Sequence, residues 1–306
     1  MAQSSSQSPR SDNIPLGVGT IIATVFALSL GDALIKAIGG GEALGIWQLF
    51  AMRSLLAFPV LLGGALVLFG SQKLRPTRTE WIAVRSFLLV TMWIAYYASL
   101  PLLPLSVAAA AYYTLPLFIV IFAALFAGEA VGRMQWSGVA LGFLGVLIVL
   151  RPGGDAFQIA ALLPILAAML YAVAMILTRT HCRDEHPVTL ALGLNLAFIL
   201  AGGAGFLIGA LAPELLTGFL SPKFVPLGFE EWRSIGILAA LLIVASVGTA
   251  IAYQVAPAST VGTFDFAYVG FALIWGFIFF SETPDVFGLV GIALIVTAGI
   301  LAVRRS

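Results

Sequence analysis

Ten apolar segments, most of them long enough to cross a bilayer, follow one another along almost the whole chain. About 20 apolar residues span a membrane as a helix. The chain of 306 residues is 61% hydrophobic and only 9% charged, whereas soluble domains carry about 25% charged residues. A bilayer is therefore the solvent, and no extramembrane domain fits beside these segments. They lie near residues 16–38, 44–70, 81–100, 106–128, 135–150, 159–178, 188–211, 232–256, 259–280 and 285–303.

The ends and loops predict the orientation of the chain. Residues 1–14 are rich in Ser, Gln and Pro and are expected to form a disordered cytoplasmic tail. Lys and Arg favour the cytoplasmic side of short loops. Both termini are expected there, because with the tail in the cytoplasm the opposite side receives only four cations. The cytoplasmic set is Arg10, Lys73, Arg75, Arg78, Arg133, Arg179, Arg183, Arg304 and Arg305, against Lys36, Arg151, Lys223 and Arg233.

The chain contains an internal repeat with an offset of 153 positions. Each half holds five segments, an odd number, so the second half crosses the bilayer in the opposite sense. The predicted fold is an all-α polytopic membrane protein of ten transmembrane helices, arranged as two inverted five-helix repeats, residues 15–155 and 156–306. Such repeats enclose a midplane site and open it to alternate sides. The matched pairs are Ser106 with Ser259, Glu129 with Glu282, Gly138 with Gly291 and Arg151 with Arg304.

Ionisable residues inside the segments are the first candidates for a site, because a charge at the bilayer centre costs about 2.5–3.5 kcal/mol. Asp32 and Lys36 lie one turn apart near the outer end of the first segment, and Arg53 enters at a similar depth. These three predict an outer cluster with proton-binding or ion-pairing roles. Arg85 and Asp265 are matched in depth near the cytoplasmic end and predict an inner pair. Structural clamps or snorkelling groups are the alternative.

Aromatic residues with polar tips are the second candidates. Such side chains either line a substrate cavity or pack as core. Trp93 and Tyr97 share one face of the third segment, and Tyr268 shares a side of the ninth segment with Asp265. The predicted substrate-binding set is Arg53, Trp93, Tyr97, Tyr171, Asp265 and Tyr268.

Several other chemistries are excluded by the sequence. The chain has no phosphate-binding loop, no H-E-x-x-H helix and no G-x-S-x-G elbow, so an enzyme is disfavoured and no cofactor is expected. Without a long basic run, nucleic acid is not an expected partner. The single Cys182 excludes an internal disulfide framework. The cluster at residues 181–186 is expected to be a solvated loop and not a metal site.

Two further patterns concern packing. Glu129 and Glu282 each lie at a tight turn before a helix start, where a carboxylate suits the helix dipole, so both are expected to be caps. Gly138 with Gly142 and Gly205 with Gly209 are small-xxx-small pairs. We expect them to serve contacts within the fold of a monomer, with a dimer interface as the alternative.

These residues resemble those of the drug/metabolite transporter superfamily, in its ten-helix EamA family. The resemblance covers nearly the whole chain after the tail. It rests on Asp32-Ala33-Leu34-Ile35-Lys36, Arg53, Leu115-Pro116-Leu117-Phe118, Gly128-Glu129 with Gly132, Gly142-Phe143-Leu144-Gly145-Val146, Leu150-Arg151-Pro152-Gly153, Ala256-Pro257-Ala258-Ser259, Phe264-Asp265 and Glu282-Thr283-Pro284-Asp285.

The resemblance implies a secondary carrier of small metabolites in the bacterial inner membrane, in contact with lipid. It implies a cavity between helices 1–4 and 6–9, with helices 5 and 10 at the periphery. We expect export of aromatic or other neutral amino acids, similar to the YddG-type exporters. Asp265 or Asp32 would bind the ammonium group and Arg53 the carboxylate. The alternatives are uptake of another metabolite, such as riboflavin or S-adenosylmethionine, and a membrane enzyme or scaffold. Tyr253-Gln254 departs from a basic residue found in many relatives, which disfavours an anionic substrate.

Overall fold

The described part of the chain is built of α-helices and two short 3-10 turns. The computed structural model describes residues 12–39, 45–99, 102–103, 108, 111–150, 159–216, 220–222, 224–281 and 286–303. The tail at residues 1–11, together with Glu282, Arg151, Arg304 and the side chain of Lys36, lies outside this description. The helices are α1 (Ile14–Gly39), α2 (Ile46–Phe69), α3 (Thr79–Ser99), α5 (Leu115–Phe126), α6 (Arg133–Leu150), α7 (Leu162–Thr180), α8 (Pro187–Leu211), α9 (Phe229–Val255), α10 (Ala258–Phe264), α11 (Ala267–Phe280) and α12 (Val286–Val303).

Among the described residues, seven helical segments are long and apolar enough to cross a membrane. Backbone amides find no water in hydrocarbon, so a helix that bonds them internally is the natural form for such segments. Six of the seven are α1, α2, α3, α8, α9 and α7 with its preceding turn, and the seventh joins α10 to α11. Helices α5 and α6 are shorter apolar helices. Ten spanning helices in two inverted repeats remain a prediction.

Helices begin and end where the sequence is punctuated by proline and polar residues. Pro187 occupies the first turn of α8 and Pro257 caps α10, positions where the missing amide hydrogen costs nothing. The sequence predicts a single helix over residues 259–280, and the structure divides this segment into two helices. A turn at Asp265 and Phe266 separates α10 from α11, although neither residue is Gly or Pro.

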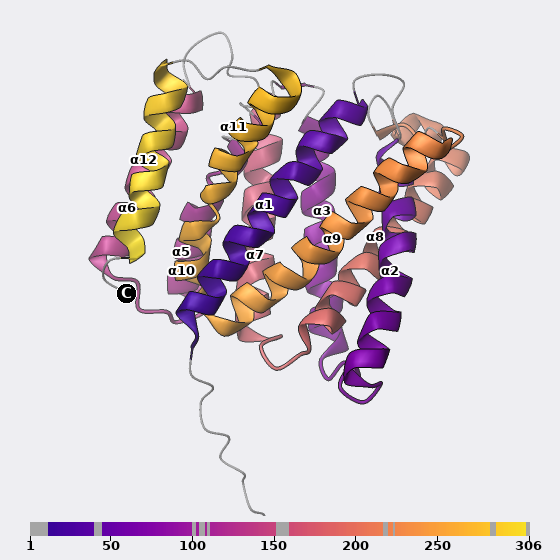
Figure 1. Ribbon diagram of the computed structural model, residues 1–306, viewed down its shortest axis with the longest axis horizontal. Helices are drawn as coiled ribbons and strands as arrows, with labels where there is room; N and C mark the ends of the chain where they lie inside the picture. Colours follow the sequence, from indigo (N-terminus) through magenta and orange to yellow (C-terminus); the bar gives the residue numbers. More distant parts are fainter. Residues whose placement is uncertain are drawn as a thin grey trace, which may run out of the picture.

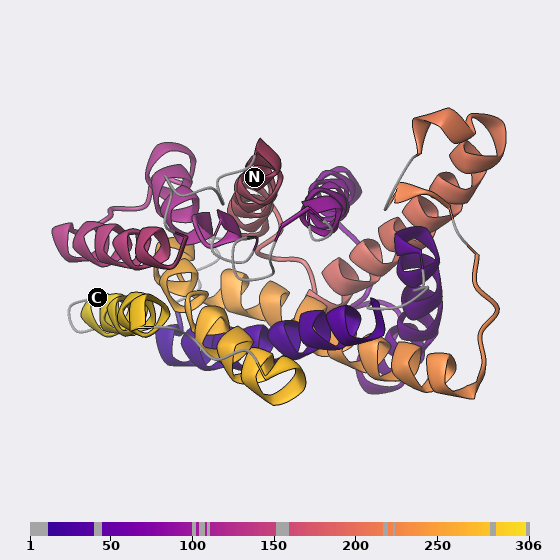
Figure 2. The same ribbon diagram turned by 90° about the horizontal axis from the view of Figure 1, so that it is seen from above.

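The helices form two layers, seen side by side from above in Figure 2. One layer runs in the order α12, α11, α1, α9, α2, and the other in the order α6, α5, α7, α3, α8, with each helix packed on the next. The layers join at one end through α6 and α12 and at the other through α2 and α8. Helices α6 and α12, the fifth and tenth of the predicted order, therefore lie at the periphery, as the resemblance implies.

The contacts occur in matched sets. Helix α1 packs on α9 as α7 packs on α3, and α1 packs on α11 as α7 packs on α5. Helix α1 begins and α12 ends at the same edge of the molecule, the lower one in Figure 1. We call this the N-terminal edge and the other the opposite edge.

Small residues allow α2 and α8 to approach closely. A Cβ added at Gly205 would lie 2.1 Å from Cδ2 of Trp47, and one at Gly202 would lie 2.7 Å from the Trp47 carbonyl oxygen. The Trp47 ring is held in place, because its Nε1 donates a hydrogen bond to the Leu220 carbonyl over 2.7 Å. At Gly209 the corresponding neighbour is Pro222. The contacts of Gly205 and Gly209 therefore lie within one molecule.

Gly205→Ala is expected to lower stability by about 1–3 kcal/mol, the usual cost of overpacking. The matched control is Gly203→Ala on the same helix, where an added Cβ meets nothing within 4 Å. Thermal unfolding of the detergent-purified variants, followed by size-exclusion chromatography, measures both. Equal melting temperatures for the two variants would contradict the close packing of α2 on α8.

Candidate functional site

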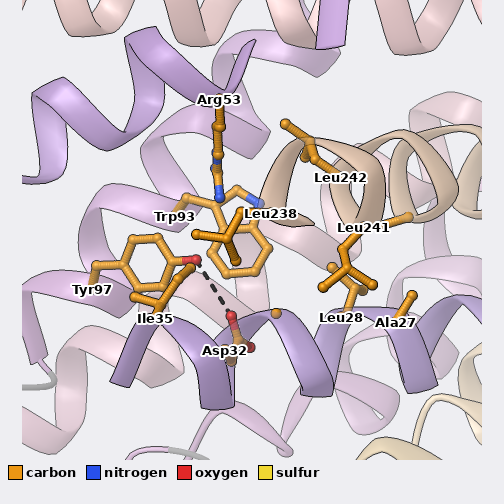
Figure 3. A pocket seen from close by; sticks show the side chains of 12 residues that line it. Ala27, Leu28, Asp32, Ile35, Arg53, Trp93, Tyr97, Leu238, Leu241 and Leu242 are labelled. Atoms are coloured by element: carbon orange, nitrogen blue, oxygen red, sulfur yellow. Dashed lines mark hydrogen bonds between the residues drawn. The ribbon is translucent and has the colours of Figure 1, made fainter. Parts of the chain in front are cut away.

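A small, partly open cavity lies between α1, α2, α3 and α9. Figure 3 shows Asp32 approaching it from α1 and Arg53 from α2, with Trp93 and Tyr97 on α3 at its side. The remaining wall is aliphatic. The lining residues are Ala27, Leu28, Gly31, Asp32, Ile35, Arg53, Trp93, Tyr97, Leu238, Leu241, Leu242 and Ala245.

Asp32 is buried and takes its hydrogen bonds from two phenols. Tyr97 Oη donates to Oδ1 over 3.3 Å, and Tyr268 Oη donates to Oδ2 over 2.5 Å. The two donors come from α3 and α11, which belong to different layers. Asp32 therefore links the layers through uncharged donors.

Arg53 is buried on α2 and packs against two adjacent aromatic rings, whose centres are 4.8 Å apart. Its guanidinium carbon lies 5.1 Å from the Phe50 ring centre and 4.6 Å from that of Phe198. These are cation–π distances. Its Nε and Nη2 have no hydrogen-bond partner. Arg53 therefore keeps N–H donors unused next to the cavity.

Asp32 and Arg53 face the same cavity without forming an ion pair. Both are described, and the ion pairs of the described residues do not include this one. In Figure 3 the guanidinium and the carboxylate stand on opposite sides of the space, with the Tyr97 hydroxyl bonded to the carboxylate. Two members of the predicted outer cluster, Asp32 and Arg53, thus line the same cavity. Its third member, Lys36, has a side chain outside the described part.

Trp93 and Tyr97 form an aromatic wall. Their ring centres are 5.0 Å apart, and the Tyr97 ring is 6.0 Å from Phe50. Since Phe50 also supports Arg53, one group of rings holds both the cation and the aromatic wall. A flat aromatic ligand would meet ring faces on this side and leucines of α9 on the other.

The other predicted site residues lie outside this cavity lining. Asp265, in the turn between α10 and α11, is 2% exposed and accepts a hydrogen bond from Tyr253 Oη of α9. Tyr171 lies next to Tyr253, with ring centres 6.4 Å apart. Tyr268 reaches the cavity only through its bond to Asp32.

The predicted pair of Arg85 with Asp265 is wrong. Arg85 is 1% exposed, and its Nε donates to Thr178 Oγ1 of α7 over 2.6 Å. Asp265 bonds to Tyr253 instead, and no ion pair joins the two described residues. Equal depth placed both groups at one level, but the rotation of each helix about its axis turns them to different neighbours.

All seven tyrosines of the chain belong to one group of neighbouring rings. From Tyr97 the ring centres step to Tyr96 over 5.9 Å and to Tyr112 over 5.1 Å. Tyr171 follows over 6.4 Å, and Tyr253, bonded to Asp265, over a further 6.4 Å. A side branch carries the group from Tyr112 through Tyr113 to Tyr268. The group therefore runs from one buried carboxylate to the other.

The loop between α7 and α8 is not the solvated loop that the sequence predicts. Cys182 and Glu185 are buried. Glu185 Oε1 accepts hydrogen bonds from the Thr77 and Arg78 amides at the start of α3, over 2.9 and 2.7 Å. Gln254 Nε2 donates to the Cys182 and Glu185 carbonyls. The described residues hold no group of three metal-ligating side chains, so this loop is a structural junction.

Burial raises the pKa of the Cys182 thiol to about 11. The nearby Glu185 carboxylate adds to the shift, and Arg85 opposes it. Nucleophilic attack requires the thiolate, so this thiol is unreactive at neutral pH while the loop is closed.

Glu129 is a cap, as predicted, but of a different helix. Gly128, with φ of +64°, turns the chain after α5. The carboxylate then accepts bonds from the Ala258 and Ser259 amides at the start of α10, over 2.9 and 3.1 Å. It thus joins the two halves of the chain at the N-terminal edge.

Sequence reasoning missed several residues that shape the site. Phe50 and Phe198, which hold Arg53, were not singled out, although Phe50 precedes Arg53 by one turn of the same helix. The leucines of α9 gave no signal because every segment is rich in leucine. Tyr96, Tyr112, Tyr113 and Tyr253 were not among the predicted site residues, and only their common neighbourhood in space reveals the chain of rings.

Known proteins with similar sequences are transporters. A riboflavin transporter of Rhizobium johnstonii is 32% identical over 213 residues, which cover 69% of this chain and 66% of that protein. A pseudopaline exporter of Pseudomonas aeruginosa is 25% identical over 300 residues, 96% of this chain and 98% of that protein. An S-adenosylmethionine uptake transporter of Rickettsia bellii is 25% identical over 289 residues, with coverages of 92% and 91%.

The chain spans just under two thirds of the riboflavin transporter that it matches. A solved crystal structure superposes with a TM-score of 0.73 at 20% identity and covers 95% of this chain and 96% of that one. That likeness shows a shared fold. The names of these relatives agree with the expectation that the chain is not an enzyme.

The family description that matches the sequence is the EamA-like transporter family, over residues 15–151. This is the family that the sequence motifs resemble. Through residues 15–151 the chain is therefore similar to the EamA-like transporter family.

Proposed function

We propose that this protein is a secondary carrier of small aromatic metabolites, which bind between Asp32 and Arg53. The observation that carries the proposal is the pair of opposite charges that share an aromatic-walled cavity without touching. The cavity has a few polar groups set in a wall of aromatic and aliphatic side chains, which is the usual lining of a small-molecule site. Unused N–H donors on Arg53 are available to a ligand.

Riboflavin is the first candidate substrate. Three relatives are named riboflavin transporters, from Rhizobium, Brucella and Vibrio. The flat ring system of riboflavin suits the Trp93 and Tyr97 wall, and its ring carbonyls accept from a guanidinium. Its side-chain hydroxyls can donate to the Asp32 carboxylate.

Neutral aromatic amino acids, the substrates expected from the resemblance to YddG-type exporters, are the second candidate. A zwitterion needs an anion for its ammonium group and a cation for its carboxylate. Asp32 and Arg53 supply one of each, on opposite sides of the cavity (Figure 3). This arrangement also fits a ligand with one charge of each sign better than it fits a dianion.

The mechanism that we propose is alternating access by two inverted five-helix repeats with ten spans, residues 15–155 and 156–306. The matched contact sets of the two layers support it. A turn at Tyr113 and Thr114, directly before α5, has its counterpart at Asp265 and Phe266, directly before α11, and this supports it too. We place the protein in the bacterial inner membrane as a monomer, as the resemblance leads us to expect. The bias in Lys and Arg places both termini in the cytoplasm.

We infer that the contacts at the N-terminal edge close the cavity on that side in one state of the transport cycle. Asp12 forms ion pairs with Arg179 over 2.8 Å and Arg183 over 2.6 Å. Gln254 holds the α7–α8 loop, and Glu129 holds the start of α10. Alternating access requires these contacts to separate and close again.

Counterflow tests the transport proposal directly. Proteoliposomes loaded with unlabelled riboflavin or tryptophan should take up the same compound in radiolabelled form. Arg53→Gln should slow exchange by about 10- to 100-fold, the effect of losing a charge-assisted hydrogen bond of about 1.5–3 kcal/mol. Arg233→Gln, at a side chain that is 61% exposed, is the control and should match the wild type.

Asp32→Asn separates the two candidates. An amide still hydrogen-bonds hydroxyl groups, but it does not neutralise an ammonium, so tryptophan exchange should fall more than riboflavin exchange. Uptake of both compounds at the level of protein-free vesicles would contradict the proposed function.

Cys182 reports whether the N-terminal edge opens. Gln254→Ala removes two hydrogen bonds of about 0.5–1.5 kcal/mol each, so N-ethylmaleimide should label Cys182 about tenfold faster than in the wild type. Labelling of both proteins should accelerate with pH up to about 11, because burial raises the thiol pKa to about 11. Gln72→Ala, at an exposed residue of the neighbouring turn, is the control. A Gln254→Ala rate equal to that of the control would mean that these bonds do not hold the edge closed.

A further inference from the structure

Asp265 is a second buried carboxylate that the substrate cavity does not use. It is 2% exposed and absent from the residues that line the cavity. Its hydrogen bond comes from Tyr253, and within the described residues it forms no ion pair. Ionisable groups inside membrane helices are rare and mark proton relays and ion pathways.

The titratable groups that Asp265 influences lie on α9, on α7 and just before α5, and α1, which also packs on α10 and α11, carries Asp32. Tyr253 lies on α9, Tyr171 on α7, and Tyr112 and Tyr113 just before α5, and the charge of Asp265 acts on all four phenols. Arg85 lies on the far side of Tyr171 and bonds to Thr178. Asp265 is thus surrounded by uncharged hydroxyl groups, which can exchange protons with a carboxylate.

One turn of chain connects Asp265 to the cavity. The Tyr268 amide donates to the Asp265 carbonyl over 3.1 Å, and the Tyr268 hydroxyl donates to Asp32. The segment from Asp265 to Tyr268 therefore contacts both buried carboxylates. The same segment forms the turn between α10 and α11. Because Glu129 anchors the start of α10, α11 can pivot at this turn.

We propose that Asp265 is a proton-binding site that couples substrate movement to the proton gradient. The carboxylate takes up one proton from the water on one side of the membrane and releases it to the other side during the transport cycle. Protonation changes the bond to Tyr253, and the turn from Asp265 to Tyr268 passes this change to Asp32. This inference rests on the transport function proposed above and adds the proton as the second ligand.

The first test compares two modes of transport in the same proteoliposomes, with riboflavin and tryptophan as probes. Counterflow at equal pH measures exchange alone, and an imposed gradient of one pH unit, in either direction, measures coupling. One proton exchanged per substrate corresponds to about tenfold accumulation per pH unit. Asp265→Asn should abolish this accumulation. The ratio of gradient-driven accumulation to counterflow exchange should then fall about tenfold. Asp184→Asn, at an exposed loop carboxylate, should keep the wild-type ratio.

The second test needs no transport substrate. Infrared difference spectra between about pH 5 and pH 8, a range above the usual Asp pKa of about 4, should contain the C=O band of a protonated buried carboxyl group. The band component from Asp265 should disappear in Asp265→Asn and persist in Asp184→Asn. Tyr253→Phe should shift the midpoint of its titration, because the hydroxyl group bonds the carboxylate.

The outcomes separate the two proposals. Counterflow without any response to a pH gradient overturns the proton site and leaves the carrier function standing. An unchanged accumulation ratio in Asp265→Asn also overturns the proton site and leaves the carrier function standing. If neither probe exchanges, the proposed function fails, and the infrared band alone decides whether Asp265 binds a proton. An unchanged band in Asp265→Asn overturns the inference in that case.

Discussion

The cost of placing charges in a bilayer governs the arrangement of this protein. Asp32 lies deep among apolar helices, and its carboxylate is held by the hydroxyl groups of Tyr97 and Tyr268. The two donors come from opposite layers. The hydrogen bonds that offset the cost of burying the carboxylate therefore also hold the layers together. Arg53 meets the cost differently, by packing its guanidinium against the adjacent rings of Phe50 and Phe198. The opposite charges stay apart, and the space between them is left for a ligand.

The use of uncharged donors has a functional consequence. A buried carboxylate paired with a cation forms a strong fixed link, whereas bonds to phenols can be exchanged for bonds to a substrate at smaller cost. Every tyrosine of the chain lies in the group of rings that runs from Asp32 to Asp265, and the turn from Asp265 to Tyr268 touches both carboxylates. The segment from Asp265 to Tyr268 can therefore respond both to the substrate cavity and to the Asp265 carboxylate.

Hydropathy and depth predict much of this structure from the sequence. The apolar segments and the approach of Asp32 and Arg53 to one cavity follow from the length of each segment and the distance of a residue from its end, whereas the peripheral position of α6 and α12 was implied only by the family resemblance. Rotation about each helix axis does not follow, and so Arg85 was wrongly paired with Asp265. The turn at Asp265 gave no Gly or Pro signal, and the burial of Glu185 depends on the distant amides of Thr77 and Arg78. Such contacts between remote segments carry no local pattern.

The central claim is that the space between Asp32 and Arg53 binds the transported molecule. A double-mutant cycle of ligand binding tests it most directly, with tryptophan binding followed by titration calorimetry and riboflavin binding by its own fluorescence. The protein is purified in detergent as wild type, Asp32→Asn, Arg53→Gln and the double variant. The account predicts saturable binding of one of these ligands, weakened by each substitution, with effects that are not additive because both groups hold one ligand. Binding of equal affinity in all four proteins, or none in the wild type, would contradict it.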